Sequence, residues 1–289
     1  MKIDLHIHSN HSDGALSVEE IVKEAKLRNI GLLSVTDHDS IACQELEFGL
    51  ARKAGLSYVS GVELNVTFSH PRFNSGKPVS LDFLGYQFVI DDTALRKKTE
   101  EMAEYRESRA AKILENLNAA FEMEGIEKLT KNDFAEIQAS VDGSLGRPHI
   151  ADYLVRKKIV KSRQEAFDKY LVKCDVPKYP LHLGDASRLV KDAEGIVVLA
   201  HPNDPHGTSL ASLSKSLFEQ TEIIQESMLP YIDGVECWHS RSDPITTRHY
   251  VSFAKEHGLI MTGGSDCHQK PIVMGTVKVP KSVVNYFKF

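Results

Sequence analysis

Apolar and polar positions alternate with two different periods in the first part of the chain. Residues 2–8 (KIDLHIH) alternate apolar and polar side chains, a pattern typical of a strand with one buried face. Residues 17–29 repeat apolar side chains with helical spacing, and Ser17 with Glu20 forms a capping-box pattern at their start. The pattern therefore predicts a strand followed by a helix.

The same succession recurs along much of the sequence. Further strands are predicted at residues 31–39, 56–68, 79–88, 195–202, 232–240 and 258–268. Further helices are predicted at residues 41–55, 213–228 and 244–258. Because strands that alternate with helices build βαβ units, we expect an α/β fold with a parallel sheet.

A long stretch from about residue 91 onward interrupts this succession. Its residues have a helical pattern and are strongly charged, as in RKKTEEMAEYRESRAAKILENLNAAF. We predict an inserted α-helical domain at residues 87–185, between the two parts of another domain at residues 1–86 and 186–289. The mixed charges of residues 97–109 favour a solvated helix face over a nucleic-acid-binding surface.

Composition narrows the class of protein. The 289 residues can bury one large core, and the formal net charge of −5 argues against an extended nucleic-acid-binding surface. No apolar run approaches the roughly 18 to 20 residues that span a bilayer, and the start lacks a secretory signal. The cysteines form no C-x-x-C pair, which favours reduced thiols; they are Cys43, Cys174, Cys237 and Cys267. We expect a cytoplasmic protein with no membrane partner.

Histidines and carboxylates gather at or just after the ends of the predicted strands. They are His6, His8, Asp37, His38, Glu63, His201, Glu236, Asp266 and His268. In an α/β barrel the carboxyl ends of the strands converge on one mouth, so we expect these side chains to meet. His6 and His8 lie on the same side of a strand and can hold one ion, while Glu63 can bridge two. Such a set suits Zn, Mn or Fe.

These segments resemble a known family. DLHIHSNHSDG, VTDHDS, GVELN, LAHP, GVE and GGSDCH are similar to the successive motifs of the PHP (polymerase and histidinol phosphatase) superfamily. The resemblance covers nearly the whole chain and implies a distorted (β/α)7 barrel with metal-dependent phosphoesterase activity. GRPHIADYLVRKKIVKSRQEAFDKYL, inside the helical insertion, resembles the branch of the nucleoside 3',5'-bisphosphate phosphatases, also described as ribonuclease AM.

The resemblance implies which residues bind metal. One ion would be bound by His6, His8, Glu63 and Asp266. Another would be bound by Asp13, His38 and His268. A third would take Glu63 as a bridge, His201 and a residue on the strand before the insertion. That residue is usually histidine in the family but is Asp82 here, and His70 is an alternative ligand close by in the sequence.

Phosphate ester hydrolysis also needs cations for the phosphate and a proton donor for the leaving oxygen. We expect the phosphate to be bound by Arg147, His149, Arg241 and Lys270. His201 or His239 could protonate the leaving group, and the sequence does not choose between them. Ser242 replaces a histidine that is common in this branch, and His239 could take over its role. We expect the insertion to act as a cap that closes one side of the barrel mouth and sets substrate choice.

The leading hypothesis is a phosphoesterase with two or three divalent ions, Mn, Fe or Zn, in which a metal-bridging hydroxide attacks phosphorus. Its substrate would be a nucleoside 3',5'-bisphosphate, which loses its 3'-phosphate, or the 5' end of a short RNA. Two alternatives remain open: a phosphatase specific for 5'-nucleotides such as AMP or for histidinol phosphate, and a non-catalytic PHP-type domain. The partner would be a small phosphate ester or a short oligonucleotide. The sequence does not set the oligomeric state.

Overall fold

Strands form where the apolar alternation predicts them. The computed structural model describes residues 1–140, 145–205 and 207–288. The strands are β1 (Lys2–Ile7), β2 (Ile30–Val35), β3 (Ser57–Tyr58), β4 (Gly61–Phe68), β5 (Val79–Tyr86), β6 (Ile196–Leu199), β7 (Gly234–His239) and β8 (Ile260–Gly264). The predicted strands are thus confirmed, except that the strand expected over residues 56–68 divides into β3 and β4, which belong to different sheets.

The strands form two sheets, one in the order β1-β2-β3 and one in the order β4-β5-β6-β7-β8. Neighbours are parallel except around β5, which is antiparallel to both β4 and β6. The expectation of a wholly parallel sheet is therefore wrong at β5. A parallel connection needs a crossover of about a dozen residues or more, and residues 69–78 between β4 and β5 are too few for one.

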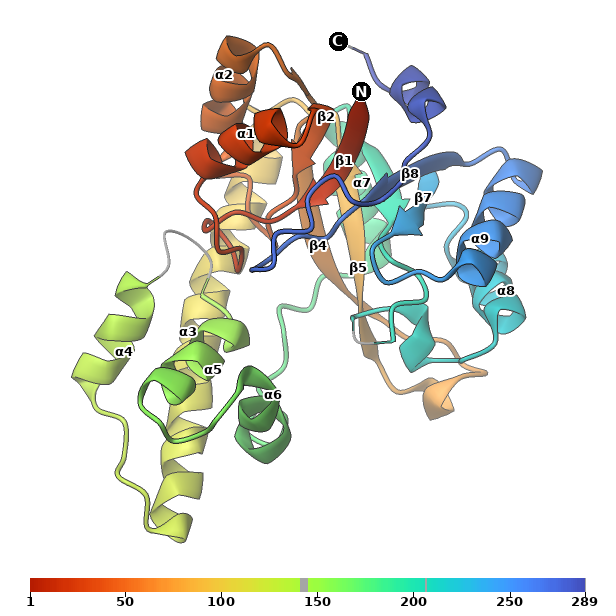
Figure 1. The fold of residues 1–289 in the computed structure, drawn as a ribbon. Helices are drawn as coiled ribbons and strands as arrows, with labels where there is room; N and C mark the ends of the chain where they lie inside the picture. The colour runs from red at the N-terminus through yellow and green to blue at the C-terminus, as the bar shows by residue number, and fades with distance from the viewer. Residues whose placement is uncertain (141–144, 206, 289) are drawn as a thin grey trace.

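The two sheets meet along their edges and bring strand ends together. A parallel bridge joins Ile7, at the end of β1, to Cys267 after β8, and another joins His38, after β2, to Glu63 in β4. The sheets therefore curve around a common interior (Figure 1). This closure places the histidines and carboxylates that follow β1, β2 and β8 beside Glu63.

Helices cover the outside of the sheets (Figure 1). They are α1 (Val18–Leu27), α2 (Gln44–Ala54), α7 (Leu183–Asp192), α8 (Leu217–Ser227) and α9 (Pro244–Glu256), with short 3-10 turns at Asn74–Gly76, Leu210–Ser212 and Lys281–Tyr286. The capping box that begins α1 is confirmed. The Glu20 amide donates to Ser17 Oγ at 3.3 Å, and the Ser17 amide donates to the Glu20 carboxylate at 2.9 Å.

The insertion is helical, as predicted, and has its own apolar core. It contains α3 (Thr93–Glu124), α4 (Lys131–Ala139), α5 (Arg147–Arg156), α6 (Arg163–Ala166) and a π-helical turn (Phe167–Leu171). Its core residues, such as Leu117 and Phe121, form a cluster separate from those of the sheets. In Figure 1 these helices project away from the sheets, and one end of α3 reaches back to them. The predicted boundary at residue 186 falls inside α7, so the domain limits stay a prediction.

A buried carboxyl on α2 leads to the first prediction. Neither carboxylate oxygen of Glu47 has a hydrogen-bond partner among the described residues, and burial, aided by Asp37 and Glu19, raises the pKa of Glu47 from 4.5 to about 8. Folding therefore opposes ionisation, so Glu47 lowers stability progressively between those two pH values. Because one pKa unit corresponds to about 1.4 kcal/mol, we expect Glu47→Gln to be more stable than wild type by at least that amount at pH 8.

The gain should shrink to about 0.4 kcal/mol at pH 4.5, where the carboxyl is protonated in the folded chain and half protonated in the unfolded chain. Denaturant unfolding at the two pH values measures it. Glu45→Gln, at an exposed position of the same helix, is the control and should show little pH-dependent difference. Equal stability differences at both pH values for Glu47→Gln would contradict the assignment of a protonated, buried carboxyl.

Candidate active site

Three overlapping groups of side chains place possible metal-ligand atoms within 4.8 Å of one another. The first group is His6, His8, Glu63 and Asp266; the second is His8, Asp13, His38 and His268; the third is His38, Glu63 and Asp82. Each group shares a residue with another, so the ligand atoms form one continuous cluster. The first group is the set that the sequence implied for one ion, and the second is the set implied for another with His8 added.

Strand ends explain how residues far apart in sequence meet. β1 carries His6 and leads directly into His8, while Asp266 follows β8. The amide of His8 donates to the carbonyl of Cys267 at 3.1 Å, and the amide of Asp266 donates to the carbonyl of His6 at 2.7 Å. The β1 and β8 ends are therefore joined by backbone hydrogen bonds at the point where their ligands lie.

Several buried polar atoms of this cluster have no hydrogen-bond partner among the described residues. They include His6 Nε2, His8 Nδ1 and Nε2, Asp13 Oδ1, His38 Nδ1, Glu63 Oε2, His201 Nδ1 and Asp266 Oδ1. Leaving such atoms unsatisfied inside a protein costs free energy unless a ligand satisfies them. Imidazole nitrogens together with carboxylate oxygens are the donors that Zn, Mn and Fe accept. The residues present therefore fit divalent metal ions.

Three carboxylates of the cluster, those of Asp13, Glu63 and Asp266, are held ionised by neighbouring imidazoles. Burial favours the neutral form of Glu63, but His38 and His6 outweigh it and hold the pKa of this carboxyl well below its ordinary value. Burial likewise opposes the charge of Asp13 and Asp266, yet nearby histidines, His268 first, keep the pKa of both well below the ordinary value. Ionised carboxylates are the form that binds metal.

Two further carboxylates support the ligands without joining the groups. Glu236 lies 3.1 Å from His6 Nδ1, and it accepts a hydrogen bond of 2.8 Å from the His201 amide. Asp37 accepts hydrogen bonds from the Ser9 amide at 2.8 Å and from the Ser12 hydroxyl at 2.6 Å. Glu236 thereby orients the His6 ring, and Asp37 fixes the loop that leads to Asp13. Such supporting contacts set ligand geometry.

Asp82 lies inside the ligand cluster. It shares the third group with His38 and Glu63, and the Asn65 side-chain amide donates to one of its oxygens. Burial, with Glu63 as the next cause, raises the pKa of Asp82 to about 6. The alternative ligand His70 belongs to none of the three groups, and its Nε2 lies 3.1 Å from Glu226. His201 also stands outside the groups, with its Nε2 2.9 Å from Glu63 Oε1.

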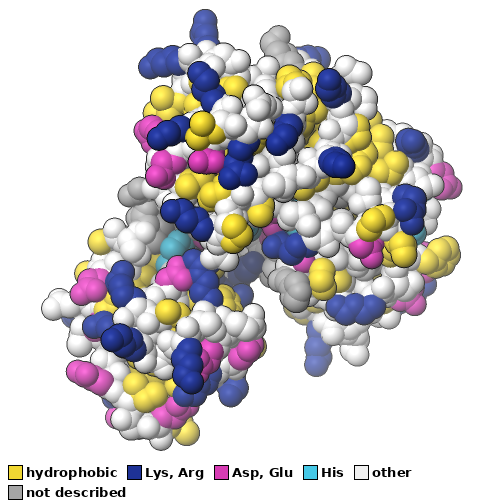
Figure 2. Space-filling model, in the orientation of Figure 1, with side chains coloured by type: hydrophobic (Ala, Val, Ile, Leu, Met, Phe, Trp, Pro, Cys, Tyr) yellow, Lys and Arg dark blue, Asp and Glu magenta, His cyan; other side chains and the backbone are white. Residues whose placement is uncertain are grey.

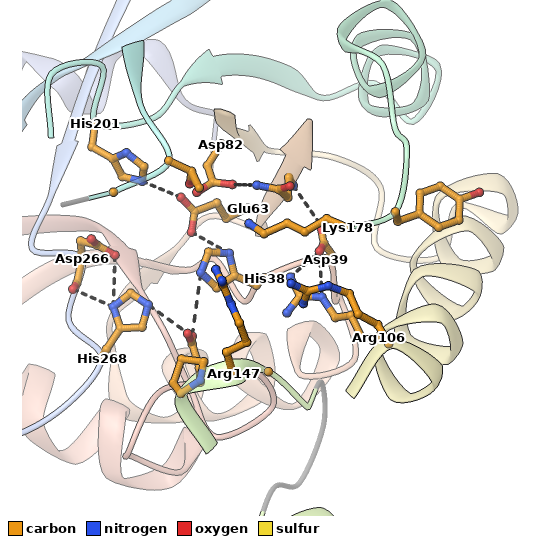
Figure 3. Close-up of a pocket in the computed structure, with 18 of the residues that line it drawn as sticks. His38, Asp39, Glu63, Asp82, Arg106, Arg147, Lys178, His201, Asp266 and His268 are labelled. Carbon is orange, nitrogen blue, oxygen red and sulfur yellow. Dashed lines mark hydrogen bonds and ion pairs between the residues drawn. The ribbon is translucent and has the colours of Figure 1, made fainter. Parts of the chain in front are cut away.

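A cavity of about 270 Å³ opens above the ligand cluster. Glu63, Asp82 and His38 lie along one side of it, and basic side chains from the insertion extend over it (Figure 3). The Lys and Arg side chains that line it are Arg106, Arg109, Arg147, Lys178 and Arg241. Figure 2 shows Lys and Arg side chains gathered where the helical insertion meets the rest of the molecule. The cavity therefore combines a metal-ligand cluster with positive charge suited to an anion.

Comparison with known proteins assigns this arrangement to a family. The PHP domain model matches residues 4–175. The chain belongs to the PHP domain family. This membership confirms the predicted α/β fold of the PHP phosphoesterases and the predicted class of enzyme, a metal-dependent phosphoesterase.

Individual relatives of this PHP protein match most of its length. It is 29% identical over 271 residues to the 3',5'-nucleoside bisphosphate phosphatase of Chromobacterium violaceum, covering 92% of this chain and 87% of that protein. It is 31% identical to a 5'-3' exoribonuclease of Haemophilus influenzae, covering 70% of this chain and 69% of that protein. A solved structure from Bifidobacterium adolescentis, provisionally assigned as a metal-dependent phosphoesterase, superposes with a TM-score of 0.80 at 26% identity. The match covers 98% of this chain and 94% of that chain.

Of the substrate-binding residues expected in this PHP protein, two line the cavity and two do not. Arg147 lines it, but its Nη1 lies 2.6 Å from the Asp175 carboxylate. Arg241 lines it and contacts Asp266 and Asp204. His149 instead accepts a 3.0 Å hydrogen bond from the Gly146 amide at the start of α5, and Lys270 is exposed outside the cavity. Neither of these two is among the lining residues.

The two candidate proton donors differ in position. His201 lines the cavity beside Glu63. His239 is buried behind Asp266: its Nε2 lies 3.3 Å from that carboxylate, and its Nδ1 accepts a hydrogen bond from the Arg241 amide at 3.3 Å. Of these two histidines, only His201 lines the cavity.

Sequence reasoning missed Arg106, Arg109 and Lys178. The first two lie in the charged run expected to be a solvated helix face, an expectation that is wrong for them: Arg109 is buried, and Arg106 is largely so. Both lie on the α3 face that carries the buried Met102 and Ala110, but the alternating charges of this run are also typical of a solvated face. Nothing in the local sequence of Lys178 marks it.

No helix in the described parts of this PHP protein has the length and apolar character needed to cross a bilayer.

Proposed function

We propose that the protein hydrolyses phosphate monoesters of nucleotides: nucleoside 3',5'-bisphosphates, from which it releases the 3'-phosphate, or the 5' ends of short RNAs. The observation that carries this proposal is the convergence of two ligand groups on Glu63, at the edge of a cavity lined with cations. The names of the relatives, a nucleoside bisphosphate phosphatase and a 5'-3' exoribonuclease, support this class of substrate.

The ligand groups would hold two or three divalent ions, Mn, Fe or Zn. When bound, such ions supply an activated water and positive charge against the phosphoryl oxygens. The first and second groups each offer imidazoles with carboxylates, and Glu63 connects the first group to the third. Asp82, with Glu63 and His38, would bind the third ion, and Asn65 holds the Asp82 carboxylate in place.

The surrounding residues would place the ester and handle its proton. His201 faces the cavity and would donate the proton to the leaving oxygen, since His239 lies behind Asp266. Arg147 and Arg241 would attract the phosphates, although each already faces a carboxylate. Residues 87–185 would act as the cap, because α3 and the segment before α7 bring their basic side chains over the metal ligands.

A panel of phosphate esters tests this function. Phosphate release would be measured with added Mn on a nucleoside 3',5'-bisphosphate, a 5'-phosphorylated short RNA, AMP and histidinol phosphate. We expect the highest kcat/KM on one of the first two. A preference for AMP or histidinol phosphate would replace the proposed specificity, since the metal ligands alone do not define the alcohol. Absence of release from every ester by a metal-loaded protein would contradict the enzymatic proposal.

A further inference from the structure

The basic side chains of the cavity differ in one respect: whether a carboxylate already neutralises them. Each of the lining arginines has a carboxylate within ion-pair distance, provided by Asp39, Asp175, Asp204 or Asp266. Lys178 has no ion pair and no side-chain hydrogen bond with any residue that the structure describes. Its ammonium is therefore the uncommitted positive charge among the described Lys and Arg side chains of the cavity wall.

The position of Lys178 suits contact with a bound molecule. It lies in the segment between the π-helical turn and α7, and its side chain extends across the cavity toward Glu63 and Asp82 (Figure 3). Lys178 also lines a neighbouring groove of about 440 Å³, together with Arg147 and Thr208. The ammonium thus lies where the groove meets the cavity that contains the metal ligands.

The electrostatic surroundings of Lys178 favour an incoming anion. Burial lowers the pKa of Lys178, and the nearby Arg106 and Arg147 act in the same direction. Asp82 is the strongest opposing influence, but it does not reach ion-pair distance. A partly buried cation without a partner is costly, and a bound anion would remove that cost. A compact ammonium can contact a phosphate from several directions, as a point charge.

We propose that Lys178 binds the phosphoryl group of the substrate that lies over Glu63 and Asp82. The arginines of the cap mainly hold the cap in place through their ion pairs with Asp39 and Asp175. This inference rests on the proposed function and deepens it, since it names the residue that binds the phosphate monoester dianion. The residues that the sequence suggested for phosphate binding, Arg147, His149, Arg241 and Lys270, did not include Lys178.

Two variants and a matched control test the proposal. Lys178→Met removes the charge, Lys178→Arg keeps it, and Lys173→Met removes an exposed lysine from the same segment. For each Mn-loaded protein we would measure kcat/KM on adenosine 3',5'-bisphosphate, inhibition by inorganic phosphate, bound Mn per chain and thermal unfolding. Loss of a charge-assisted phosphate contact lowers kcat/KM by about ten- to a hundredfold. Lys178→Met should lose that factor and be less inhibited by phosphate, with unchanged metal content and folding. Lys178→Arg should lose less catalytic efficiency, and Lys173→Met should lose none.

Two results would overturn the proposal. The first is Lys178→Met with full catalytic efficiency and unchanged inhibition by phosphate. The second is Lys178→Met with more bound Mn than wild type, which would show that the ammonium takes the place of an ion beside Asp82. If wild type released phosphate from no ester, the proposed function would fail, and binding of inorganic phosphate to the metal-loaded protein, measured by calorimetry, would still decide the role of Lys178.

Discussion

Glu63→Gln is expected to lower phosphate ester hydrolysis by more than about a hundredfold and to reduce the number of bound metal ions. Loss of a residue that only supports a metal ligand lowers metal affinity or activity about ten- to a hundredfold, and Glu63 is itself a candidate ligand in two groups. Its other oxygen faces His201 Nε2 at 2.9 Å, so the substitution also disturbs the candidate proton donor. Glutamine keeps the size of the side chain and removes the charge.

Measured kcat/KM, together with metal content by mass spectrometry, checks this result. Glu226→Gln is the matched control, because Glu226 pairs with His70 and Arg72 and belongs to none of the ligand groups. The control should retain full activity and metal content. A Glu63→Gln protein with both normal metal content and normal rate would show that the first and third groups do not share this carboxylate in the way proposed.

Arg106→Met is expected to destabilise the protein by about 3–5 kcal/mol, the usual cost of removing one partner from a buried ion pair. Arg106 Nε donates to the Asp39 carboxylate at 2.9 Å and Nη2 donates to the same oxygen, so α3 of the cap is attached to the segment after β2. Asp39 also accepts a 2.8 Å hydrogen bond from the backbone amide of Asn65. Without Arg106, a buried carboxylate next to His38 loses its counter-charge.

A second arginine on the same helix supplies the control for this prediction. Arg96 pairs with Glu45 and Asp91 at the surface, so Arg96→Met should cost about 1 kcal/mol or less. The double variant Arg106→Met/Asp39→Asn should recover part of the lost stability, because the unpaired charge is then removed. Denaturant unfolding compares the three proteins. Equal losses for Arg96→Met and Arg106→Met would contradict a buried attachment of the cap.

The strands and the candidate metal ligands were predictable because their signals are local. Alternation of apolar side chains marked β1 and β2, and the residues that follow these strands, His8 and His38, belong to the candidate ligand groups. Because the carboxyl ends of parallel strands converge in an α/β barrel, the sequence also predicted that His8 and Asp266 meet. The antiparallel β5 was missed because alternation reports that a strand exists and not its direction.

The basic wall of the cavity was not predictable from local pattern. Arg106 and Arg109 lie in a helix whose charges alternate as on a solvated face, and only the packing of α3 against the rest of the chain turns them inward. Arg147 was expected to be available for phosphate, yet Asp175, distant in sequence, pairs with it. His149 lies in a motif that suggested substrate binding, but its ring accepts a hydrogen bond from the start of its own helix. Pairings between distant charges decide which cation remains available, and a single sequence does not record them.

The most direct test of the metal-centred account is anomalous diffraction from crystals of the Mn-loaded protein, recorded above and below the Mn absorption edge. The account predicts two or three Mn peaks, each within bonding distance of one ligand group, with the Glu63 carboxylate in contact with at least one ion. Peaks located elsewhere, or fully ordered His6, His8, Glu63 and Asp266 side chains with no peak between them in Mn-saturated crystals, would contradict it.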